Sequence, residues 1–429
     1  MPGLFDDLRW RGLIAHSTDP AALQDDLDQR SIRFYLGCDP TAPSLHVGNL
    51  LQLITVQRLQ AAGHTPFLLV GGSTGLIGDP RLTAERGLNP VDQVQAWVER
   101  IKVQVAPYID FDGPNPGRLV NNYDWTHQVT VLDFLRDIGQ HFSISRMLAR
   151  EVVRARLESG ISYTEFSYVL LQSYDYLVLH RDHGVSLQTG GSDQFGNITA
   201  GVDLIRRVTG HHCHGLATPL VTKADGSKYG KTAGQAVWLD PALTSPYAFH
   251  QFFLNAEDAM VVDYLKLFTR RDRDDITELA RLTAEQPQLR AAQRALADDL
   301  TDLVHSQAER RQAALAAQAV FGRENLRRLT AATLAGIAQQ LPSAPVATID
   351  QLSVVEALAA VGLTRSKGEA RRAVQEGGAY VNNQRVAEAD QRLSADDWLP
   401  GGHIVLRRGK KTVGLLRLDP SPDSAPDPR

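Results

Sequence analysis

Several stretches of the sequence combine residue types that could bind a nucleotide and its phosphates. In DPTAPSLHVGNL (39–50), a Pro-rich turn precedes an apolar run, which predicts a helix beginning near Ser44 with His46 and Gly48 in its first turn. The free N–H groups and the dipole of such a helix favour phosphate, and Gly48 would let a nucleotide approach the backbone. An ordinary capped helix with a surface histidine would show the same pattern.

A second stretch, LVTKADGSKYGKT (220–232), places Lys223, Lys228 and Lys231 among glycines. This composition predicts a mobile basic loop. Its charges suit a leaving pyrophosphate, because their attraction strengthens as negative charge develops there in the transition state. The alternative is a solvated lysine-rich hairpin.

A third stretch, SLQTGGSDQFGNI (186–198), predicts a strand that ends in two glycines. Ser192 would cap the following helix, with Asp193 and Gln194 in its first turn. Asp193 is placed to accept hydrogen bonds from ribose hydroxyls. It could equally serve only to complement the helix dipole.

A predicted apolar helix, TEFSYVLLQSYDYLVL (164–179), is interrupted by Tyr168, Gln172 and Asp175. Their i, i+4, i+7 spacing puts the three side chains on one face. Polar groups on an apolar helix need partners. They therefore either line a polar ligand pocket or form hydrogen bonds within the core, and the first interpretation is favoured.

Metal binding is not expected. The run of His211, His212, Cys213 and His214 is too crowded for its side chains to converge on one tetrahedral ion. The two cysteines, Cys38 and Cys213, cannot form a disulfide framework, and both thiols are expected to be free.

The elements that must position these residues follow from the hydropathy pattern of the 429 residues. Apolar runs such as FYLGCDP (34–40) and TPFLLVGG (65–72) alternate with helical patterns, which predicts an α/β fold with a Rossmann-like parallel sheet over residues 1–222. Residues 223–340 would form the mobile loop and a helical domain, 341–351 a linker, 352–418 a small α+β module with its own core, and 419–429 a disordered tail. No run of eighteen apolar residues and no secretory signal pattern occur, so a cytoplasmic protein without membrane contact is expected.

Together, HVGN (46–49) and KYGKT (228–232) resemble the HIGH and KMSKS signatures of class I aminoacyl-tRNA synthetases. The flanking stretches VGGSTGLIGDP, NNYDW, TEFSYVLLQSYD and GGSDQFGNITAG resemble the bacterial tyrosyl-tRNA synthetase family, and the resemblance covers residues 1 to about 418. The terminal segment LTRSKGEARRAVQEGGAYVNNQRV (363–386) resembles the RNA-binding domain of that family.

The resemblance implies a role for each matching residue. Tyr35 and Asp175 would bind the phenolic hydroxyl of tyrosine, Asp79, Tyr168 and Gln172 its ammonium group, and Gln194 its carboxylate, with Gly37 alongside. Cys38, Asp39, Gly48, Gly191 and Asp193 would contact ATP or the adenylate. Thr41, His46, Asn49, Arg86, Lys228, Lys231 and Thr232 would act on the phosphates. Arg150, Arg206, Arg207, Arg365, Lys367, Arg371, Arg372, Arg407, Arg408, Lys410 and Lys411 would contact tRNA.

The implied activity is tyrosine–tRNA ligation, with ATP, L-tyrosine and tRNA(Tyr) as substrates and Mg²⁺ arriving with ATP. A homodimer is implied, with Tyr163 near its interface. Asn49 replaces the second histidine of HIGH, and Phe195 stands where tryptophan is frequent; Asn49 can still donate a hydrogen bond, so a tuned function is expected. The alternatives are a tryptophan-specific synthetase, a small-molecule nucleotidylyltransferase, and an RNA-binding relative without catalysis. The phenol-binding pair and the retained His46 and Lys228 disfavour them.

Overall fold

The computed structural model describes residues 3–80, 89–232 and 235–419. The chain forms two compact units, one made of residues 1–240 and 259–280 and the other of 241–258 and 281–429. The second unit thus begins at Pro241 and includes both the helical region and the terminal module, which the sequence pattern had placed in separate domains. Within the described residues, no helix is long and apolar enough to cross a bilayer.

The first unit is built on a sheet of six strands in the order β1-β6-β5-β2-β3-β4. The strands are β1 His16–Ser17, β2 Arg33–Cys38, β3 Thr65–Val70, β4 Arg118–Asn121, β5 Val185–Gly191 and β6 His214–Thr218. All neighbours pair in parallel except β1 and β6. Leu36, Leu69 and Leu187 are buried in the sheet, as expected for strands covered on both faces.

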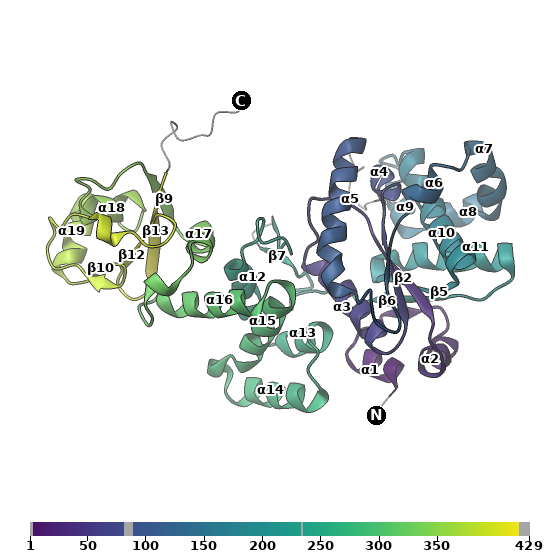
Figure 1. Cartoon of the computed structure of the whole chain (residues 1–429), viewed down its shortest axis with the longest axis horizontal. Coiled ribbons are helices and arrows are strands. Elements are labelled where there is room, and N and C mark those ends of the chain that lie inside the picture. The colour runs from purple at the N-terminus through teal and green to yellow at the C-terminus, as the bar shows by residue number, and fades with distance from the viewer. Residues whose placement is uncertain (1–2, 81–88, 233–234, 420–429) are drawn as a thin grey trace. The chain divides into compact units, whose positions relative to one another are not determined.

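The strand order reverses between β2 and β5. From β2 the chain continues through α3 (Val47–Ala61) to β3, whereas from β5 it continues through α11 (Phe195–Thr209) to β6 on the opposite side. Because such crossovers are right-handed, α3 and α11 lie on opposite faces of the sheet, as Figure 1 shows. Ligands of open α/β sheets bind at the carboxyl ends of the strands at such a point. This edge carries Cys38, Asp39 and Gly191.

The remaining helices of this unit pack around the sheet and extend its connections. They are α1 Leu4–Trp10, α2 Pro20–Gln29, α4 Thr74–Ile77, α5 Val91–Val105, α6 Tyr123–Thr126, α7 Val131–Asp133, α8 Ile144–Leu148, α9 Glu151–Arg156, α10 Tyr163–His183 and α13 Val261–Phe268, with a π-helical turn at Phe134–Ile138. The longest, α10, carries the predicted polar face and ends at Gly184 in the left-handed conformation.

The second unit contains a helical part and a sheet. Its helices are α12 Pro246–Leu254, α15 Ala291–Val304, α16 Gln307–Ala319, α17 Ala331–Gln340, α18 Val354–Ala360 and α19 Lys367–Gln375, while α14 (Arg273–Glu285) runs from the first unit into it. The strands are β9 Ser343–Val346, β10 Ala379–Val381, β11 Gln384–Arg385, β12 His403–Arg408 and β13 Thr412–Leu418, in the order β11-β10-β12-β13-β9.

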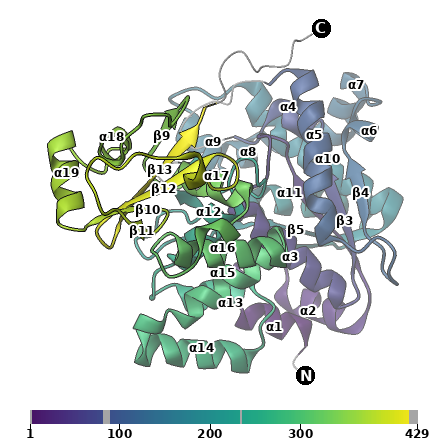
Figure 2. The ribbon, with the colours of Figure 1, turned by 60° about the vertical axis from the view of Figure 1, so that its left-hand side comes forward.

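The terminal sheet is covered on both faces, with α18 and α19 on one side and α17 on the other (Figure 2). Ile404 and Leu406 of β12 pack with Val354 and Leu358 of α18. The alternate residue Val405 packs with Leu334 of α17. The module therefore has the core expected of it, but it shares a second core with the helical part.

The segment 341–351, expected to be a linker, contributes to this sheet. Its residues 343–346 form β9, which pairs in parallel with β13 from Leu415 to Leu418. Pro345 is tolerated there because β9 is an edge strand. A strand at the edge needs only one hydrogen-bonded neighbour, and its pattern does not show in a short Pro-rich sequence.

Candidate active site

A buried carboxylate at the middle of α10 is fixed by two donors from the segment that follows β4. Asp175 is 3% exposed and accepts hydrogen bonds from Asn122 Nδ2 and Trp125 Nε1, each at 2.9 Å. Burial raises the pKa of Asp175 to about 7, opposed by these two hydrogen bonds and helped by the nearby charge of Asp39. The carboxyl group is therefore poised between its two protonation states near neutral pH.

Tyr35 lies in the same pocket at the middle of β2. It is 1% exposed, and its ring packs against Tyr176 with centroids 5.2 Å apart. Burial, with a smaller contribution from Asp175, raises the pKa of its phenol well above the ordinary value. Its hydroxyl has no hydrogen-bond partner among the described residues. A buried hydroxyl without a partner is costly, so an incoming polar group would be stabilised there.

A second network lies at the carboxyl ends of β2 and β3. Asp39 accepts from Tyr168 Oη at 2.6 Å and from Thr74 Oγ1 at 2.6 Å. Thr74 in turn accepts from Asn122 Nδ2 at 3.0 Å. Gly71 makes room for this arrangement, because a Cβ there would lie 2.2 Å from both Asp39 Oδ1 and Thr74 Oγ1. The two carboxylates Asp39 and Asp175 are thus linked through Asn122.

A third carboxylate, Asp79, is held at both of its oxygens. Gln194 Nε2 donates to Oδ2 at 2.7 Å, and Asn197 Nδ2 donates to Oδ1 at 3.2 Å. Asn197 also joins Gln194 Oε1 at 3.0 Å and accepts from Arg150 Nη2. The sequence predicted Arg150 to contact tRNA. In the structure it is half-buried and belongs to this network, and its contact with tRNA stays a prediction.

The remaining residues predicted for the ligand surround these networks. Gln172 lies on the same face of α10 as Tyr168 and Asp175, and its buried Oε1 accepts no hydrogen bond from the described residues. Gly37 is exposed, and a Cβ added to it would meet no atom within 4 Å, so open space adjoins β2.

The Asp193 side chain is exposed and lies close to Gly191. A Cβ added to Gly191 would come within 2.6 Å of the Asp193 carboxylate. Burial, with a smaller contribution from Asp39, raises the pKa of the Cys38 thiol to about 12.

The helix predicted to bind phosphate begins later than expected. α3 starts at Val47, and His46 is its N-cap with an extended backbone, rather than a first-turn residue. His46 Nδ1 accepts from Gly48 N at 3.0 Å, while Asn49 Oδ1 accepts from His46 N at 3.1 Å, which together form a capping box. Asn49 Oδ1 thus acts as an acceptor at the third helical position, and donation by its Nδ2 stays a prediction. Thr41 lies in the preceding turn, with its N–H bonded to Asp39 O at 2.9 Å.

The basic segment is a hairpin placed against this helix terminus. Val47 N donates to Val237 O at 3.0 Å, and a Cβ on Gly230 would lie 3.8 Å from Gly48 N. Tyr229 stacks on Tyr264 with centroids 4.2 Å apart, which anchors the base of the hairpin. Lys228 is exposed, and Lys231 and Thr232 form β7. The fold therefore brings together the two separate stretches that the sequence predicted to bind phosphate. Arg86 lies outside the described residues.

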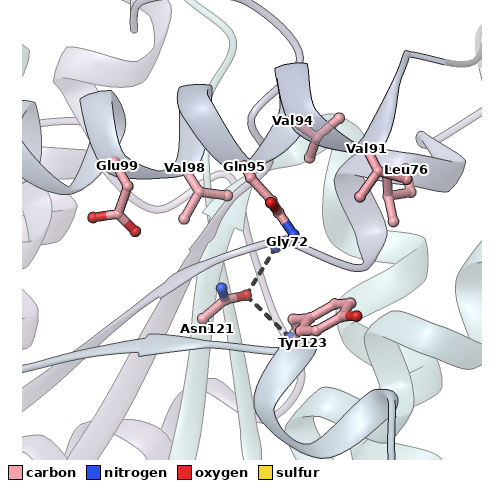
Figure 3. A pocket seen from close by; sticks show the side chains of 9 residues that line it. All are labelled: Gly72, Leu76, Val91, Val94, Gln95, Val98, Glu99, Asn121 and Tyr123. Atoms are coloured by element: carbon pink, nitrogen blue, oxygen red, sulfur yellow. Dashed lines mark hydrogen bonds between the residues drawn. The ribbon is translucent and has the colours of Figure 1, made fainter.

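A pocket of about 320 Å³ lies beside this site rather than in it (Figure 3). Asn121 Oδ1 accepts there from Gly72 N at 3.2 Å and from Tyr123 N at 3.0 Å, which fixes the turn that presents Asn122 to Asp175. Its lining is mostly apolar: Gly72, Leu76, Val91, Val94, Gln95, Val98, Glu99, Asn121 and Tyr123.

Most residues predicted to contact tRNA are exposed, and several of them also form ion pairs, such as Lys367 with Glu356 at 2.8 Å and Arg371 with Asp390 at 3.1 Å. Six are exposed on the terminal module: Arg365, Lys367, Arg371, Arg372, Lys410 and Lys411. Arg206 and Arg207 on α11 both pair with Asp203, at 2.6 and 3.2 Å. Arg408 pairs with Glu369 at 2.9 Å.

Arg407 does not lie on the open surface that was expected. It is 8% exposed, its guanidinium lies 3.8 Å from the centroid of the Tyr380 ring, and its Nη1 donates to Gly409 O at 2.6 Å. Arg407 and Arg408 point to opposite faces of β12. Arg407 shares its face with Val405, which packs against α17. Two neighbouring arginines therefore have different surroundings, which the basic run RRGKK did not indicate.

The histidine-rich turn forms separate pairs. His211 Nδ1 lies 3.0 Å from His180 Nε2, and His214 Nε2 lies 2.8 Å from Asp26 Oδ2. Across the described part of the chain, no group of three His, Cys, Asp or Glu side chains has the arrangement of a metal site.

Several residues of the site were not predicted from the sequence: Gly71, Thr74, Asn122, Trp125 and Asn197. Asn122 and Trp125 lie in the NNYDW stretch and Asn197 in GGSDQFGNITAG, so the resemblance marked the segments. It did not indicate which side chains turn inward. For Thr74 and Asn122 the available signal was their position just after strands β3 and β4.

Comparisons with known proteins agree with this geometry. Residues 27–322 match the family model of class I tRNA synthetases (W and Y), and residues 334–416 match the tyrosine–tRNA ligase SYY-like C-terminal domain. The chain is 58% identical over 416 residues to the tyrosine–tRNA ligase of Cutibacterium acnes, covering 97% of this chain and 100% of the relative. It is 55% identical over 419 residues to that of Kineococcus radiotolerans, covering 97% and 99%.

The fold has solved counterparts. A C-terminally truncated mitochondrial tyrosyl-tRNA synthetase of Aspergillus nidulans matches with a TM-score of 0.68 and 29% identity, covering 75% of this chain and 95% of that one. The two family models, the relatives and the site agree, and the chain belongs to the tyrosine–tRNA ligase family of class I aminoacyl-tRNA synthetases.

Proposed function

We propose that the protein activates L-tyrosine with ATP and transfers the tyrosyl group to tRNA(Tyr). The observation that carries this proposal is the buried pair of Tyr35 and Asp175 at the bottom of the pocket. Asp175 uses Asn122 and Trp125 on its two oxygens and retains acceptor capacity, while the Tyr35 hydroxyl has no partner among the described residues. A phenolic hydroxyl can donate to the first and accept from the second.

The other end of tyrosine would meet the remaining networks. Asp79, Tyr168 and Gln172 would hold the ammonium group, and Gln194 would hold the carboxylate. The carboxylate oxygen would then attack the α-phosphorus of ATP, and the bond to the β-phosphate would break to release pyrophosphate. No side-chain nucleophile is needed, because the chain contributes positioning and charge stabilisation.

The phosphates would lie where the hairpin meets the N-terminus of α3. There His46 at the N-cap of α3 and the exposed Lys228 are the leading candidates, with Asn49, Thr41, Arg86, Lys231 and Thr232 as the further candidates. The N–H groups of Val47, Gly48 and Asn49 already donate to Val237 O, His46 Nδ1 and His46 O, so α3 would contribute through its dipole. Mg²⁺ would accompany ATP and screen the same oxygens, as is usual for nucleotide substrates. The ribose and adenine would occupy the open space near Gly37, Gly191 and Asp193.

In the second step, a terminal ribose hydroxyl of tRNA would take the tyrosyl group from the adenylate. The exposed cations of the terminal module would bind its phosphates, and Arg206 and Arg207 would add contacts nearer the site. We also propose a cytoplasmic homodimer. Tyr163 is 70% exposed, and Val131 and Leu132 on α7 are 74% and 78% exposed in the same unit, which suits burial against a second copy.

An ATP–pyrophosphate exchange assay across the amino acids tests the proposal. Exchange should depend on tyrosine, with phenylalanine and tryptophan at least about a hundredfold less efficient, because either would leave the buried Tyr35 and Asp175 without their partner. Exchange that prefers tryptophan, or no exchange at all, would contradict it. Sedimentation velocity of the wild type and of Tyr163→Asp tests the dimer.

A further inference from the structure

One buried amide, that of Asn197, connects two of the groups expected to hold the charged end of tyrosine, Asp79 and Gln194. Asn197 is 2% exposed, near the start of α11. Its Nδ2 donates to Asp79 Oδ1 at 3.2 Å and to Gln194 Oε1 at 3.0 Å, and its Oδ1 accepts from Arg150. Both amide hydrogens and the amide oxygen are therefore engaged, which fixes the orientation of the side chain.

Asp79, Gln194 and Asn197 form a closed ring of hydrogen bonds. Gln194 donates to one oxygen of Asp79 while Asn197 donates to the other, and Asn197 also ties the oxygen of Gln194. Neither Asp79 nor Gln194 can then rotate without breaking two contacts. Groups held in their binding orientation before the ligand arrives lose less entropy when it binds.

Arg150 completes the ring from outside. Burial lowers the pKa of its guanidinium, while the carboxylate of Asp79 opposes that shift. The side chain has room because residue 196 is glycine: a Cβ there would lie 3.3 Å from Arg150 Nη2. The positive charge of Arg150 thus offsets part of the negative charge of the half-buried Asp79.

We propose that Asn197 is a positioning residue for the ammonium and carboxylate groups of tyrosine, and that Arg150 holds it in place. This inference rests on the proposed function and deepens it. It also gives Arg150 a task in the first step of the reaction, in addition to any contact with tRNA.

The test compares ligands that share the phenol but differ at the charged end. Tyrosine carries both charged groups, tyramine lacks the carboxylate, and tyrosol lacks both. For Asn197→Ala we expect the dissociation constant of tyrosine to rise at least tenfold in equilibrium dialysis, that of tyramine by less, and that of tyrosol by less than twofold. Asn197→Asp has nearly the volume of the wild type but cannot donate, so it should behave like Asn197→Ala.

Arg150→Ala should raise the dissociation constant of tyrosine at least threefold in the absence of tRNA, with tyrosol again unchanged. The matched control is Thr199→Ala, on the same turn of α11, whose hydroxyl donates only to Gly196 O. It should bind all three ligands like the wild type.

Two results would overturn the proposal. If every variant binds tyrosine normally, Asn197 positions nothing, and if tyrosine and tyrosol weaken equally, its role is only to support the fold. These outcomes leave the proposed function intact, which fails separately if the wild type neither binds tyrosine nor catalyses exchange. Should Asn197→Ala not fold, Asn197→Asp and Arg150→Ala decide the matter.

Discussion

At the scale of single residues, the hydrogen bonds and the ionisation of the pocket depend on how its carboxylates are buried. Three aspartates there are partly or fully removed from water, and each accepts two hydrogen bonds from other side chains. Asp39 accepts from Thr74 and Tyr168, and Asp79 accepts from Gln194 and Asn197. Asp175 accepts from Asn122 and Trp125. Three like charges in one region would repel each other if all were ionised. The pKa of Asp175 is raised chiefly by its burial, and the charge of Asp39 adds a smaller contribution.

Tyrosine binding should therefore depend on pH. Below a pKa of about 7, Asp175 is protonated and no longer an anionic acceptor, so one proton must leave before the phenol binds in the proposed way. We expect tyrosine to bind about tenfold more weakly at pH 6 than at pH 8, since affinity falls about tenfold for each pH unit below the pKa. Equilibrium dialysis without ATP measures this. Constant affinity from pH 6 to 8 would contradict it, and Asp175→Asn should remove the dependence.

Gly71 should not tolerate a side chain. In Gly71→Ala the new Cβ would meet Asp39 Oδ1 and Thr74 Oγ1 at 2.2 Å and force their hydrogen bond apart. Overpacking of this kind costs about 1–3 kcal/mol. We expect a lower urea midpoint and at least tenfold slower exchange. Gly139→Ala is the control, because its nearest neighbour would lie at 3.8 Å, and equal behaviour of the two variants would refute the argument.

At the scale of elements, the site depends on where helices and strands end. α3 begins only after His46 because the imidazole and the Asn49 side chain satisfy N–H groups that the helix itself leaves unpaired. The hairpin is then joined to the residues before that helix through Val47 N and Leu239 N, which donate to Val237 O and Leu45 O. Cap and hairpin thus lie against each other, at the place proposed for the phosphates.

Two substitutions of Asn49 should separate its structural role from its role toward ATP. Asn49→Ala removes half of the capping box, which should lower the free energy of unfolding by about 0.5–2 kcal/mol. Asn49→Asp keeps the acceptor for His46 N and complements the helix dipole, so stability should be retained. Its negative charge should nevertheless raise the KM for ATP. Urea unfolding and exchange kinetics decide, and an unchanged KM in Asn49→Asp would exclude phosphate near this terminus.

At the scale of the whole molecule, the terminal module cannot be removed cleanly. A fragment ending at residue 345 would lose β12 and β13 and uncover Val320, Leu334 and Ile337, which pack against Val405 and Leu415. If this fragment failed to charge tRNA, the missing cations and the disrupted core would both be causes. Substitution of exposed cations leaves both cores intact and is the sharper test.

A variant with Arg371, Arg372, Lys410 and Lys411 all replaced by alanine should bind tRNA more weakly while catalysing exchange normally. Each lost phosphate contact should reduce the slope of log affinity against log salt by about 0.7 to 0.9. Binding measured from about 50 to 300 mM salt checks this, and an unchanged slope would remove the module from tRNA binding. Arg407→Ala should instead lower the melting temperature, because that side chain is packed over Tyr380.

The sequence by itself determined the parallel sheet, the polar face of α10 and the two stretches proposed to bind phosphate. Each of these features is encoded in consecutive residues. The strands and helices show as apolar residues that recur with a period of about two or about 3.6 residues, and the two stretches show as glycines clustered with charged side chains. Its resemblance to a known family supplied the proposed roles of Tyr35 and Asp79, which no local pattern indicates.

Only the tertiary structure decided which polar side chains face one another. Asn122 reaches Asp175 across 53 positions and Gln194 reaches Asp79 across 115, contacts that arise because parallel strands distant in sequence end at one edge of the sheet. Arg407 and Arg408 are a second case. They lie on opposite faces of β12, and the elements that cover each face are distant in sequence, so the local sequence does not show which arginine is enclosed.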